Sequence, residues 1–452
     1  MSSRARGLGY RLVRVVAVLL LWLFYRRIET IHAERIPATG PVVIAANHHN
    51  ALVDAMLIVA SVPRRITPLA KAPLFRHPLI GPFLRLVGAV RVHRRVDGAD
   101  PRENAAMFAA AVAALRAGGA LLIFPEGTSQ PRPMLMPLRT GAARIVLCAA
   151  ADGVSVALVP VGLVFDEPGT FRAGSALLSV GPPVATDEVR RQYGEAPERA
   201  VRALTERLAE AIRAQIVEAE DHHTLELLGT LERAWRHERG EPGRVEAAAS
   251  LAWRRDVMRA ARALAERAPG RVAAFRHHLE RYAERLRESG LRDGQLGQRY
   301  TARMVTRYAL SNALNLAVML PLALAGMVAH AVPYALTDLV ARRLMDTAEE
   351  EATNKMAAGL VLYPVSWLVE GWLVWRWAGG RALAVFAVLL LPCGLVALAW
   401  RERLSRVRRQ ARAFGRFLVD RQREHGLLAE RRALVEEAEA LGALSGRPRT
   451  SA

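Results

Sequence analysis

Three stretches of the chain contain almost no charged residue, and they constrain its fold more than any other feature. Residues 308–337 contain no Lys, Arg, Asp or Glu, residues 356–375 contain only Glu370, and residues 383–400 contain none. A helix needs about 20 such residues to cross a hydrocarbon core about 30 Å thick. The stretches therefore predict membrane segments, within a transmembrane region that we place at residues 301–400.

A basic run follows the last of these stretches, at residues 401–412 of a tail that extends over residues 401–452. Basic flanks are typical of the cytoplasmic side of a membrane, so the tail is predicted to be cytoplasmic. If the domain before the membrane region also lies in the cytoplasm, the number of full passes is even. Three candidate segments then leave one that does not cross, either the run with Pro321 or the segment with Glu370.

The first 30 residues combine basic and apolar character. Four arginines lie among residues 4–14, the run Val15–Tyr25 is uncharged, and two further arginines follow it. Eleven uncharged residues are too few to span a bilayer. A signal peptide would continue with small residues at a cleavage site, but this run ends in Trp22-Leu-Phe-Tyr25. We therefore predict that residues 1–30 form an uncleaved helix in the membrane interface.

The charge of the chain points to an anionic partner. The formal net charge of +20 arises from 63 Lys and Arg against 43 Asp and Glu, a balance typical of proteins that bind nucleic acids or anionic membrane surfaces. The apolar segments favour anionic membrane lipids. Residues 216–300 are predicted to be helical with charges of both signs and no readout motif, so we expect no nucleic-acid binding. The two cysteines, Cys148 and Cys393, exclude a disulfide framework and a cysteine-based metal site.

Residues 31–215 have the pattern of an α/β domain. Val42–Ala46 is a short apolar run, as expected of a strand buried on both faces. A helix at residues 104–117, a strand at Ala120–Phe124 and a strand at Val156–Phe165 are predicted farther along the chain. Alternating strands and helices predict an α/β fold with a mostly parallel sheet flanked by helices, whose ligands bind beyond the carboxyl ends of the strands.

A motif follows the first of these strands directly, Asn47-His48-His49-Asn50-Ala-Leu-Val-Asp54. Four residues separate His49 from Asp54, and in one continuous helix their side chains would point about 140° apart. They can meet if His49 lies at the strand-to-helix turn and Asp54 lies in the first helical turns. The carboxylate would then fix the imidazole tautomer and leave the other ring nitrogen to accept a proton. We predict His49 as the general base and Asp54 as its orienting partner, with His48 as the alternative base.

Three further blocks follow in order: Gly88-Ala-Val-Arg-Val-His-Arg94, Phe124-Pro-Glu-Gly-Thr-Ser129 and Val159-Pro-Val161. Together with the H-x4-D spacing, they make residues 30–190 resemble the glycerolipid acyltransferase family, which includes glycerol-3-phosphate and lysophosphatidate acyltransferases. The helical insert and membrane region that follow resemble the layout of acyltransferases acting on glycerol-3-phosphate or dihydroxyacetone phosphate.

The resemblance implies that His49 removes a proton from an acceptor hydroxyl as this attacks a fatty acyl thioester, while Asp54 orients His49. It also implies a substrate-binding set, in which basic side chains bind the acceptor phosphate. The set comprises Lys71, Arg94, Glu126, Gly127, Thr128 and Arg139, with Arg91 and Arg95 as alternatives to Arg94. Asn47, Gly88, Pro125 and Pro160 are expected to shape the pocket. No cofactor and no metal are implied, only acyl-CoA or an acyl carrier protein as co-substrate.

We therefore expect a membrane-bound enzyme of phospholipid biosynthesis that acylates glycerol-3-phosphate or dihydroxyacetone phosphate. Its active site is expected to face the cytoplasm at a bacterial inner membrane. Lysophosphatidate, or another lysophospholipid, is the alternative acceptor. A non-catalytic membrane scaffold is a further alternative, disfavoured because the predicted catalytic and binding residues are all present. The pairs His222-His223 and His277-His278 are expected on the surface of charged helices.

Overall fold

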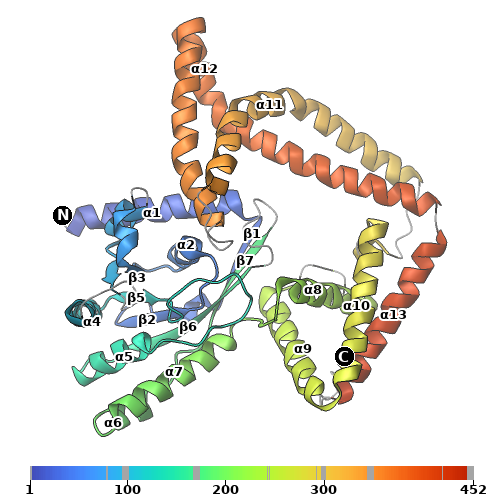
Figure 1. Cartoon of the computed structure of the whole chain (residues 1–452). Helices are drawn as coiled ribbons and strands as arrows, with labels where there is room; N and C mark the ends of the chain where they lie inside the picture. Colours follow the sequence, from blue (N-terminus) through green and yellow to red (C-terminus); the bar gives the residue numbers. More distant parts are fainter. Residues whose placement is uncertain are drawn as a thin grey trace. The chain divides into compact units, whose positions relative to one another are not determined.

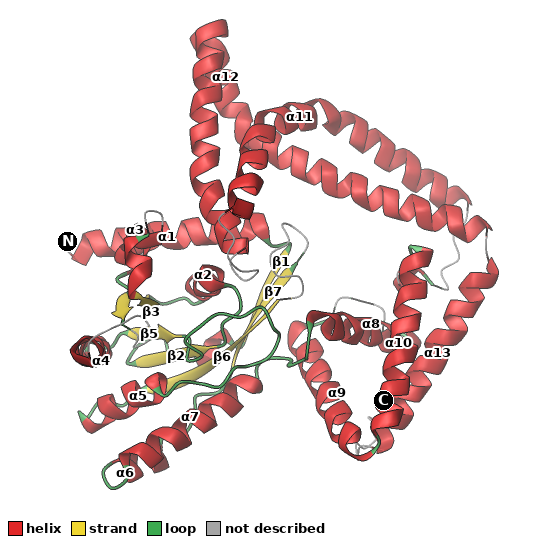
Figure 2. Cartoon of the chain, viewed as in Figure 1, coloured by secondary structure: helices red, strands yellow, loops and turns green. Residues whose placement is uncertain are grey.

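The computed structural model describes residues 3–77, 80–93, 101–165, 174–241, 243, 245–291, 293–296, 302–343, 351–419 and 421–444. The chain divides into two compact units. The first comprises residues 1–225, 245–258 and 345–357, and the second comprises residues 226–244, 259–344 and 358–452. All strands lie in the first unit, whereas the described residues of the second unit form helices and their connections (Figure 2).

The first unit contains a seven-stranded sheet with the order β1-β7-β6-β2-β5-β3-β4 (Figure 1). Its strands are β1 (Arg27–Ile31), β2 (Val42–Ala46), β3 (Ile66–Lys71), β4 (Val90–Val92), β5 (Ala120–Ile123), β6 (Ala157–Phe165) and β7 (Ser175–Val180). Neighbouring strands are parallel except for β6 and β7. The predicted α/β fold with a mostly parallel sheet is confirmed, and its three predicted strands coincide with β2, β5 and β6.

Helices pack on both faces of the sheet. One face is covered by α1 (Ser3–Phe24) and α2 (Ala51–Ser61), and the other by α4 (Pro101–Arg116), α5 (Gly141–Ala151) and α7 (Pro197–Arg213). Side chains of β2 belong to the hydrophobic cores on both faces. Val42 and Ile44 pack toward α1 and α2, and Val43 and Ala45 pack toward α4, α5 and α7, because successive strand side chains point to opposite faces. The shorter elements are α3 (Ile80–Val87), α6 (Asp187–Tyr193) and the 3-10 helices η1 (Ala33–Arg35) and η2 (Ala72–Arg76).

The first helix, α1, has one face packed on the sheet unit and one that this unit leaves exposed. The packed face carries the buried side chains Tyr10, Ala17, Leu21 and Phe24. The other face exposes Leu8, Leu12, Val15, Leu19 and Trp22. The exposed set recurs every three or four residues, which is the period of one side of a helix. The helix therefore presents a continuous apolar stripe.

The second unit consists of long helices. It includes most of α8 (His222–Glu238), part of α9 (Ala247–Arg267), α10 (Pro269–Ser289), η4 (Asp293–Gln295), α11 (Ala302–Arg343), most of α12 (Glu351–Val419) and α13 (Arg421–Leu444). An ion pair and a hydrogen bond join α10 to α13, with Arg285 Nη1 2.7 Å from Glu430 Oε2 and His278 Nδ1 2.8 Å from Glu437 Oε2. Charged side chains of the predicted helical region therefore pair with side chains of the tail that follows the membrane region.

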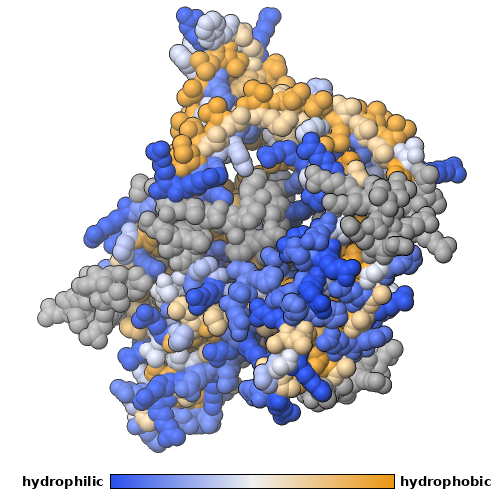
Figure 3. Space-filling model, turned by 45° about the vertical axis from the view of Figure 1, so that its right-hand side comes forward, coloured by the Kyte–Doolittle hydropathy of each residue, from blue (hydrophilic) through white to orange (hydrophobic). Residues whose placement is uncertain are grey.

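Three helices in the described part of the chain are long and apolar enough to cross a membrane, judged by length and composition: Gly7–Phe24, Arg303–Arg343 and Thr353–Ala411. The last holds two predicted segments, because α12 reverses at Gly379 (φ 81°, ψ 179°), a conformation that glycine adopts without a Cβ clash. Apolar side chains gather over α11 and α12 (Figure 3). The predicted membrane segments thus fall on α11 and on the two arms of α12.

Candidate active site

The predicted site residues gather where parallel strands end. His48 and His49 follow β2, the segment Phe124–Ser129 follows β5, and Lys71 ends β3. Because β2, β5 and β3 are parallel neighbours, these positions share one edge of the sheet. The backbone N–H of His48 donates to Glu126 Oε1 (2.7 Å), and that of Gln130 donates to the His48 carbonyl (3.1 Å). The first two segments are thereby fixed to each other.

The turn between β2 and α2 is organised by the carboxylate of Asp54. Its Oδ2 accepts three hydrogen bonds, from the backbone N–H of His49 (2.6 Å) and of Asn50 (2.9 Å) and from Nδ1 of His48 (2.9 Å). Asp54 is fully buried in the first turn of α2, where the helix dipole favours negative charge. Ala51, between Asn50 and Asp54, has φ 38°, a strained conformation of the kind that functional turns often hold.

This geometry corrects the predicted pairing. The imidazole that Asp54 bonds is that of His48, the predicted alternative base, and Asp54 reaches His49 only through its backbone. The His49 ring turns elsewhere, with Nδ1 3.1 Å from the carbonyl oxygen of Gln130. Side chains of successive residues leaving a strand point in opposite directions. Only one of the two neighbouring rings can therefore face Asp54.

The His48 ring is held on two sides and open at one atom. It stacks on Phe124, with ring centroids 4.0 Å apart and an interplanar angle of 13°. An ionised carboxylate can only accept, so the ring nitrogen facing Asp54 carries the proton. Nε2 has no hydrogen-bond partner among the described residues, and the side chain is 12% exposed. An imidazole oriented by a carboxylate at one nitrogen and open at the other is the arrangement of a general base.

Asn47 and Pro125, both predicted to shape the pocket, are buried beside this turn. Asn47 anchors the turn to β6 through two hydrogen bonds with the backbone of Leu163: Nδ2 donates to its carbonyl (2.9 Å), and its N–H donates to Oδ1 (2.7 Å). The carbonyl of Pro125 accepts a hydrogen bond from the backbone N–H of Arg139 (2.7 Å). Both residues thus fix backbone segments on which the site is built.

Glu126 joins the two halves of the site. It is 3% exposed, and both carboxylate oxygens accept backbone hydrogen bonds, from His48 (2.7 Å) and from Met136 (3.0 Å). The sequence predicted that this carboxylate binds the acceptor. In the structure it instead positions the segment after β5 against the turn between β2 and α2.

The buried carboxyl of Glu126 leads to a pH-dependent expectation. Burial raises its pKa from 4.5 to about 7, although hydrogen bonds from Met136 and His48 oppose the shift. Because folding raises this pKa, the protonated carboxyl contributes to the stability of the folded protein below pH 4.5. This contribution is lost as the pH rises through 7 and the carboxyl ionises. Relative to the wild type, Glu126→Gln should therefore gain about 2–3 kcal/mol of unfolding free energy between pH 5 and pH 8. Unfolding in detergent across this range measures the difference, and parallel curves for the two proteins would contradict it.

Gly127 and Arg139 lie against each other. Gly127 has φ 74°, and a Cβ at this position would lie 2.6 Å from Arg139 Nε, so any larger residue would displace the arginine. Arg139 is exposed, and its guanidinium pairs with no residue in the described ranges. The hydroxyl of Thr128 lies 3.4 Å from the Ser129 carbonyl oxygen. Glycine and arginine together leave a positively charged surface close to the segment after β5.

Of the remaining basic candidates, Lys71 and Arg91 are described by the structure and two are not. Lys71 ends β3 at the edge of the sheet that holds the site. Arg91 lies in β4, where its guanidinium is 5.0 Å from the centroid of the Phe75 ring. Arg94 and Arg95 lie outside the described residues.

The two remaining predicted pocket residues, Gly88 and Pro160, lie at different distances from this edge. Gly88 follows α3 with φ 75° and precedes β4, so it lies near the amino end of that strand. Pro160 is buried within β6, in register with Ala45 of β2. Because β2 ends at Ala46, Pro160 lies inside the sheet close to the carboxyl edge that holds the site, whereas Gly88 lies at the opposite end of its strand.

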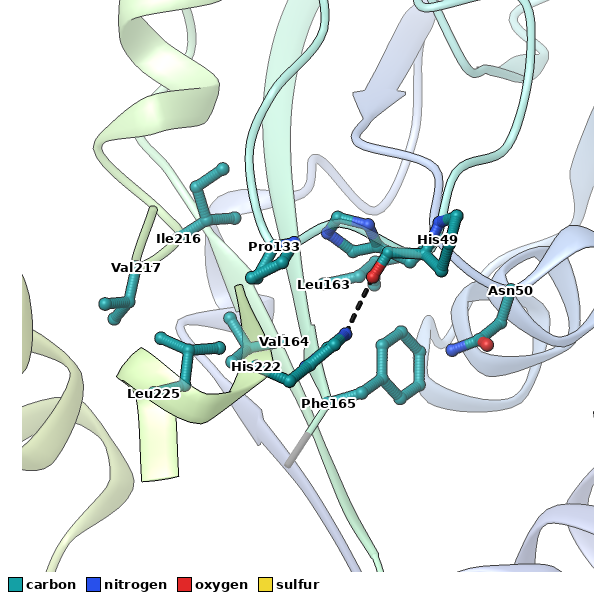
Figure 4. Close-up of a pocket in the computed structure, with 11 residues that line it drawn as sticks. His49, Asn50, Pro133, Leu163, Val164, Phe165, Ile216, Val217, His222 and Leu225 are labelled. Atoms are coloured by element: carbon teal, nitrogen blue, oxygen red, sulfur yellow. Dashed lines mark hydrogen bonds between the residues drawn. The ribbon is translucent and has the colours of Figure 1, made fainter. Parts of the chain in front are cut away.

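A small pocket, partly open to solvent, lies beside His49 (Figure 4). Its lining residues come from the turn between β2 and α2, the end of β6, the loop after β5 and the segment 216–225. They are His49, Asn50, Pro131, Pro133, Leu163, Val164, Phe165, Ile216, Val217, His222 and Leu225. The lining is mainly apolar, and burial lowers the pKa of His49.

The segment 216–225 is a wall of this pocket that the sequence did not reveal. Nε2 of His222 donates to the carbonyl of Pro131 (2.7 Å), and the N–H of Ala219 donates to that of Pro133 (2.9 Å). The sequence placed this segment in the charged helical region and expected His222 on its surface. No local motif marks the contact, because it depends on a loop about 90 residues earlier in the chain.

Comparisons with known proteins agree with the motifs. The acyltransferase family model matches residues 27–164. Glycerol-3-phosphate O-acyltransferase 2 of Saccharomyces cerevisiae is 31% identical over 140 residues, which are 30% of this chain and 19% of the yeast protein. The 1-acyl-sn-glycerol-3-phosphate acyltransferase of Borreliella burgdorferi is 27% identical, over 39% of this chain and 68% of that protein. The human 1-acyl-sn-glycerol-3-phosphate acyltransferase alpha is 25% identical, over 40% of this chain and 64% of its own length.

Among solved structures, the chain resembles the 1-acyl-sn-glycerophosphate acyltransferase PlsC from Thermotoga maritima. The identity is 23% and the TM-score is 0.33, over 45% of this chain and 83% of that one. The chain thus covers about a fifth of the length of its yeast relative, and more than half of its own residues lie outside each of these matches.

Proposed function

Residues 27–164 form a domain of the acyltransferase family, and on this premise we propose that the chain moves a fatty acyl group from a thioester to a hydroxyl of glycerol-3-phosphate or dihydroxyacetone phosphate. The observation that carries the proposal is the His48–Asp54 pair at the carboxyl edge of the sheet, joined by Glu126 to the segment after β5. Lysophosphatidate is the alternative acceptor, because it offers the same two groups, a hydroxyl and a phosphate.

The reaction needs one base and no covalent intermediate. Nε2 of His48 takes the proton of the acceptor hydroxyl as its oxygen attacks the thioester carbon. The imidazolium, stabilised by Asp54, then gives this proton to the departing thiolate as the carbon–sulfur bond breaks. The thioester is already activated, so no acyl-enzyme is required. The thiol product is coenzyme A or the prosthetic group of an acyl carrier protein.

Arg139 is the first candidate for the acceptor phosphate. It is exposed beside Gly127, whose missing side chain leaves room for the arginine, and a guanidinium binds phosphate through two parallel hydrogen bonds. Lys71 offers a second positive charge at the end of β3. Arg94 keeps the phosphate-binding role that the family resemblance implies for it.

We place this reaction at the surface of a membrane, on the cytoplasmic face of a bacterial inner membrane. The exposed stripe of α1 fits an amphipathic helix in the interface, and its arginines would meet anionic headgroups. Such a position brings the acyl donor from the aqueous side and releases the lipid product into the bilayer.

An acceptor comparison tests the proposal. Purified full-length protein in vesicles is given labelled long-chain acyl-CoA or acyl carrier protein, with glycerol-3-phosphate, dihydroxyacetone phosphate and lysophosphatidate offered side by side. Transfer to either of the first two that is lost in His48→Ala supports the proposal. Transfer to lysophosphatidate alone supports the alternative, which the names of the Borreliella and human relatives favour. No transfer to any of the three would contradict both.

A further inference from the structure

The two arms of α12 have matching lengths and charged ends. The first runs from Lys355 to Arg376 with 20 residues between them, and the second runs from Arg381 to Arg401 with 19. At 1.5 Å per residue each arm extends over about 30 Å, the thickness of a bilayer's hydrocarbon core. Both lengths therefore suit one complete crossing.

The arms contact each other near the reversal at Gly379 and leave apolar side chains exposed. A Cβ at Gly371 of the first arm would lie 3.3 Å from Leu383 and 3.8 Å from Phe386 of the second arm. More than half of each side chain is exposed at Val365, Leu368, Val369, Val385, Val388 and Leu391. Lipid tails can cover these exposed apolar side chains, so no further protein is needed to bury them.

The reversal between the arms has the composition of a membrane interface. Trp372, Trp375 and Trp377 are 57%, 54% and 85% exposed, and Arg376 and Arg381 lie on either side of Gly379. Tryptophan and arginine are enriched where helices meet the headgroups. We call residues 376–381 the tip of the hairpin.

The helix before the hairpin, α11, begins beside the end of the second arm. Nε of Arg403 donates to Asn312 Oδ1 (3.1 Å), and Nε1 of Trp400 donates to the Leu316 carbonyl (3.0 Å). Arg403 and Trp400 both lie within two residues of Arg401, the charged end of that arm. The first turns of α11 therefore lie at the level where the second arm leaves the hydrocarbon.

The middle of α11 meets the arms at a deeper level. The His330 ring lies 5.6 Å from that of Trp367 and 6.0 Å from that of Tyr363, and the backbones touch where Gly326 meets the Cys393 carbonyl. Trp367 is 12 residues from the charged end of its arm, and Cys393 is eight residues from the end of the other. Measured along the helix from the charged ends, Trp367 therefore lies about 18 Å from Lys355 and Cys393 lies about 12 Å from Arg401.

The last turns of α11 return toward the level where the helix began. A Cβ at Gly359 would lie 3.8 Å from Thr337 Cγ2, and Gly359 is only about 6 Å along the first arm from Lys355. Pro321 and Pro333 lie on either side of the deepest part, and proline bends a helix by removing a hydrogen bond. Figure 1 shows the resulting arch of α11 and the reversal of α12.

We propose that α12 crosses the bilayer twice as a hairpin, and that α11 dips to about the middle of the bilayer and returns to the side from which it entered. Both elements are helical, so their backbone groups stay bonded in lipid. The helix α12 begins within the first unit, where Met356 is buried in the core and the hydroxyl of Thr353 lies 3.5 Å from the Asn50 carbonyl oxygen. Two passes give the even number that a cytoplasmic tail requires.

Single cysteines test this topology in the full-length chain, independently of its enzymatic activity. Cys148→Ser with Cys393→Ala removes both native thiols. Met304→Cys and Arg343→Cys then report on the two ends of α11, Gly380→Cys on the tip, and Ala411→Cys on the tail; all four positions are exposed. A membrane-impermeant maleimide is applied to intact cells and to inverted membrane vesicles.

The tip should react in intact cells, and the other three positions should react only in inverted vesicles. Reaction of Met304→Cys and Arg343→Cys from opposite faces would show that α11 crosses and would overturn the proposal. Reaction of the tip from the same face as Ala411→Cys would overturn the hairpin. A nitroxide at Val328, which is 75% exposed, should be buried deeper than one at either end of α11; equal depths would exclude the arch.

Discussion

Replacing His48 by alanine is expected to lower the turnover of acyl transfer by roughly 10²–10⁴-fold, the contribution of a positioned general base. His48 is the imidazole that Asp54 holds, and its Nε2 has no other partner among the described residues. The loss should appear in kcat measured at saturating thioester and acceptor, since the proton is transferred in the chemical step. Thermal unfolding of the variant separates this loss from misfolding.

His49→Ala is the matched control, because the two residues are neighbours of the same type in one turn. The His49 ring bonds the Gln130 carbonyl and lines the pocket, so its removal should alter KM for a substrate that enters the pocket and should leave kcat within about tenfold. The reverse result, a large loss of kcat for His49→Ala with His48→Ala active, would restore the assignment that sequence spacing favoured.

The choice between these two histidines shows where sequence reasoning stopped. The motif places a strand, a turn and a helix in order, and the structure confirms that order. Which imidazole faces the carboxylate depends on the path of the backbone through Asn50 and Ala51, and Ala51 has the unusual φ of 38°. A spacing of four or five intervening residues does not determine this path, because the turn is shaped by hydrogen bonds to Asp54 Oδ2.

Much of the sheet could be predicted where strands are buried on both faces. β2, β5 and β6 are continuous apolar runs, which such strands require. β1 contains Arg27 and Glu29 at one edge of the sheet, and β4 has three residues at the other. Edge strands carry polar side chains and short runs, so their sequences lack the signal. The order of the strands depends on pairing between distant segments and is not encoded in any one of them.

The walls of the site were the hardest part to predict. The segment 216–225 closes the pocket from beyond the family match, and Thr353 contacts the turn between β2 and α2 from about 300 residues away. Each contact is made by one or two side chains, and no sequence motif marks the helix that carries them. Local periodicity predicts that such helices exist, but it does not predict which surface they meet.

Asp54→Asn is expected to reduce turnover by roughly 10²–10⁴-fold while the protein stays folded. The amide oxygen can take the place of Oδ2 and accept the hydrogen bonds of His49 and Asn50, so the turn should keep its shape. The neutral amide lacks the charge that stabilises an imidazolium at His48. Loss of that charge at the start of α2 should cost only about 0.3–1 kcal/mol of unfolding free energy.

Asp54→Ala separates the two duties of this carboxylate. It leaves the backbone N–H groups of His49 and Asn50 without their acceptor, at a cost of about 1–3 kcal/mol each, so both turnover and unfolding temperature should fall. The pair of variants is read by comparing kcat with thermal stability in the same detergent. If Asp54→Asn keeps full turnover, the carboxylate serves only to shape the turn, and His48 must act without an ionic partner. If Asp54→Asn is inactive and stable while Asp54→Ala is inactive and unstable, the same oxygen both holds the turn and supports the base.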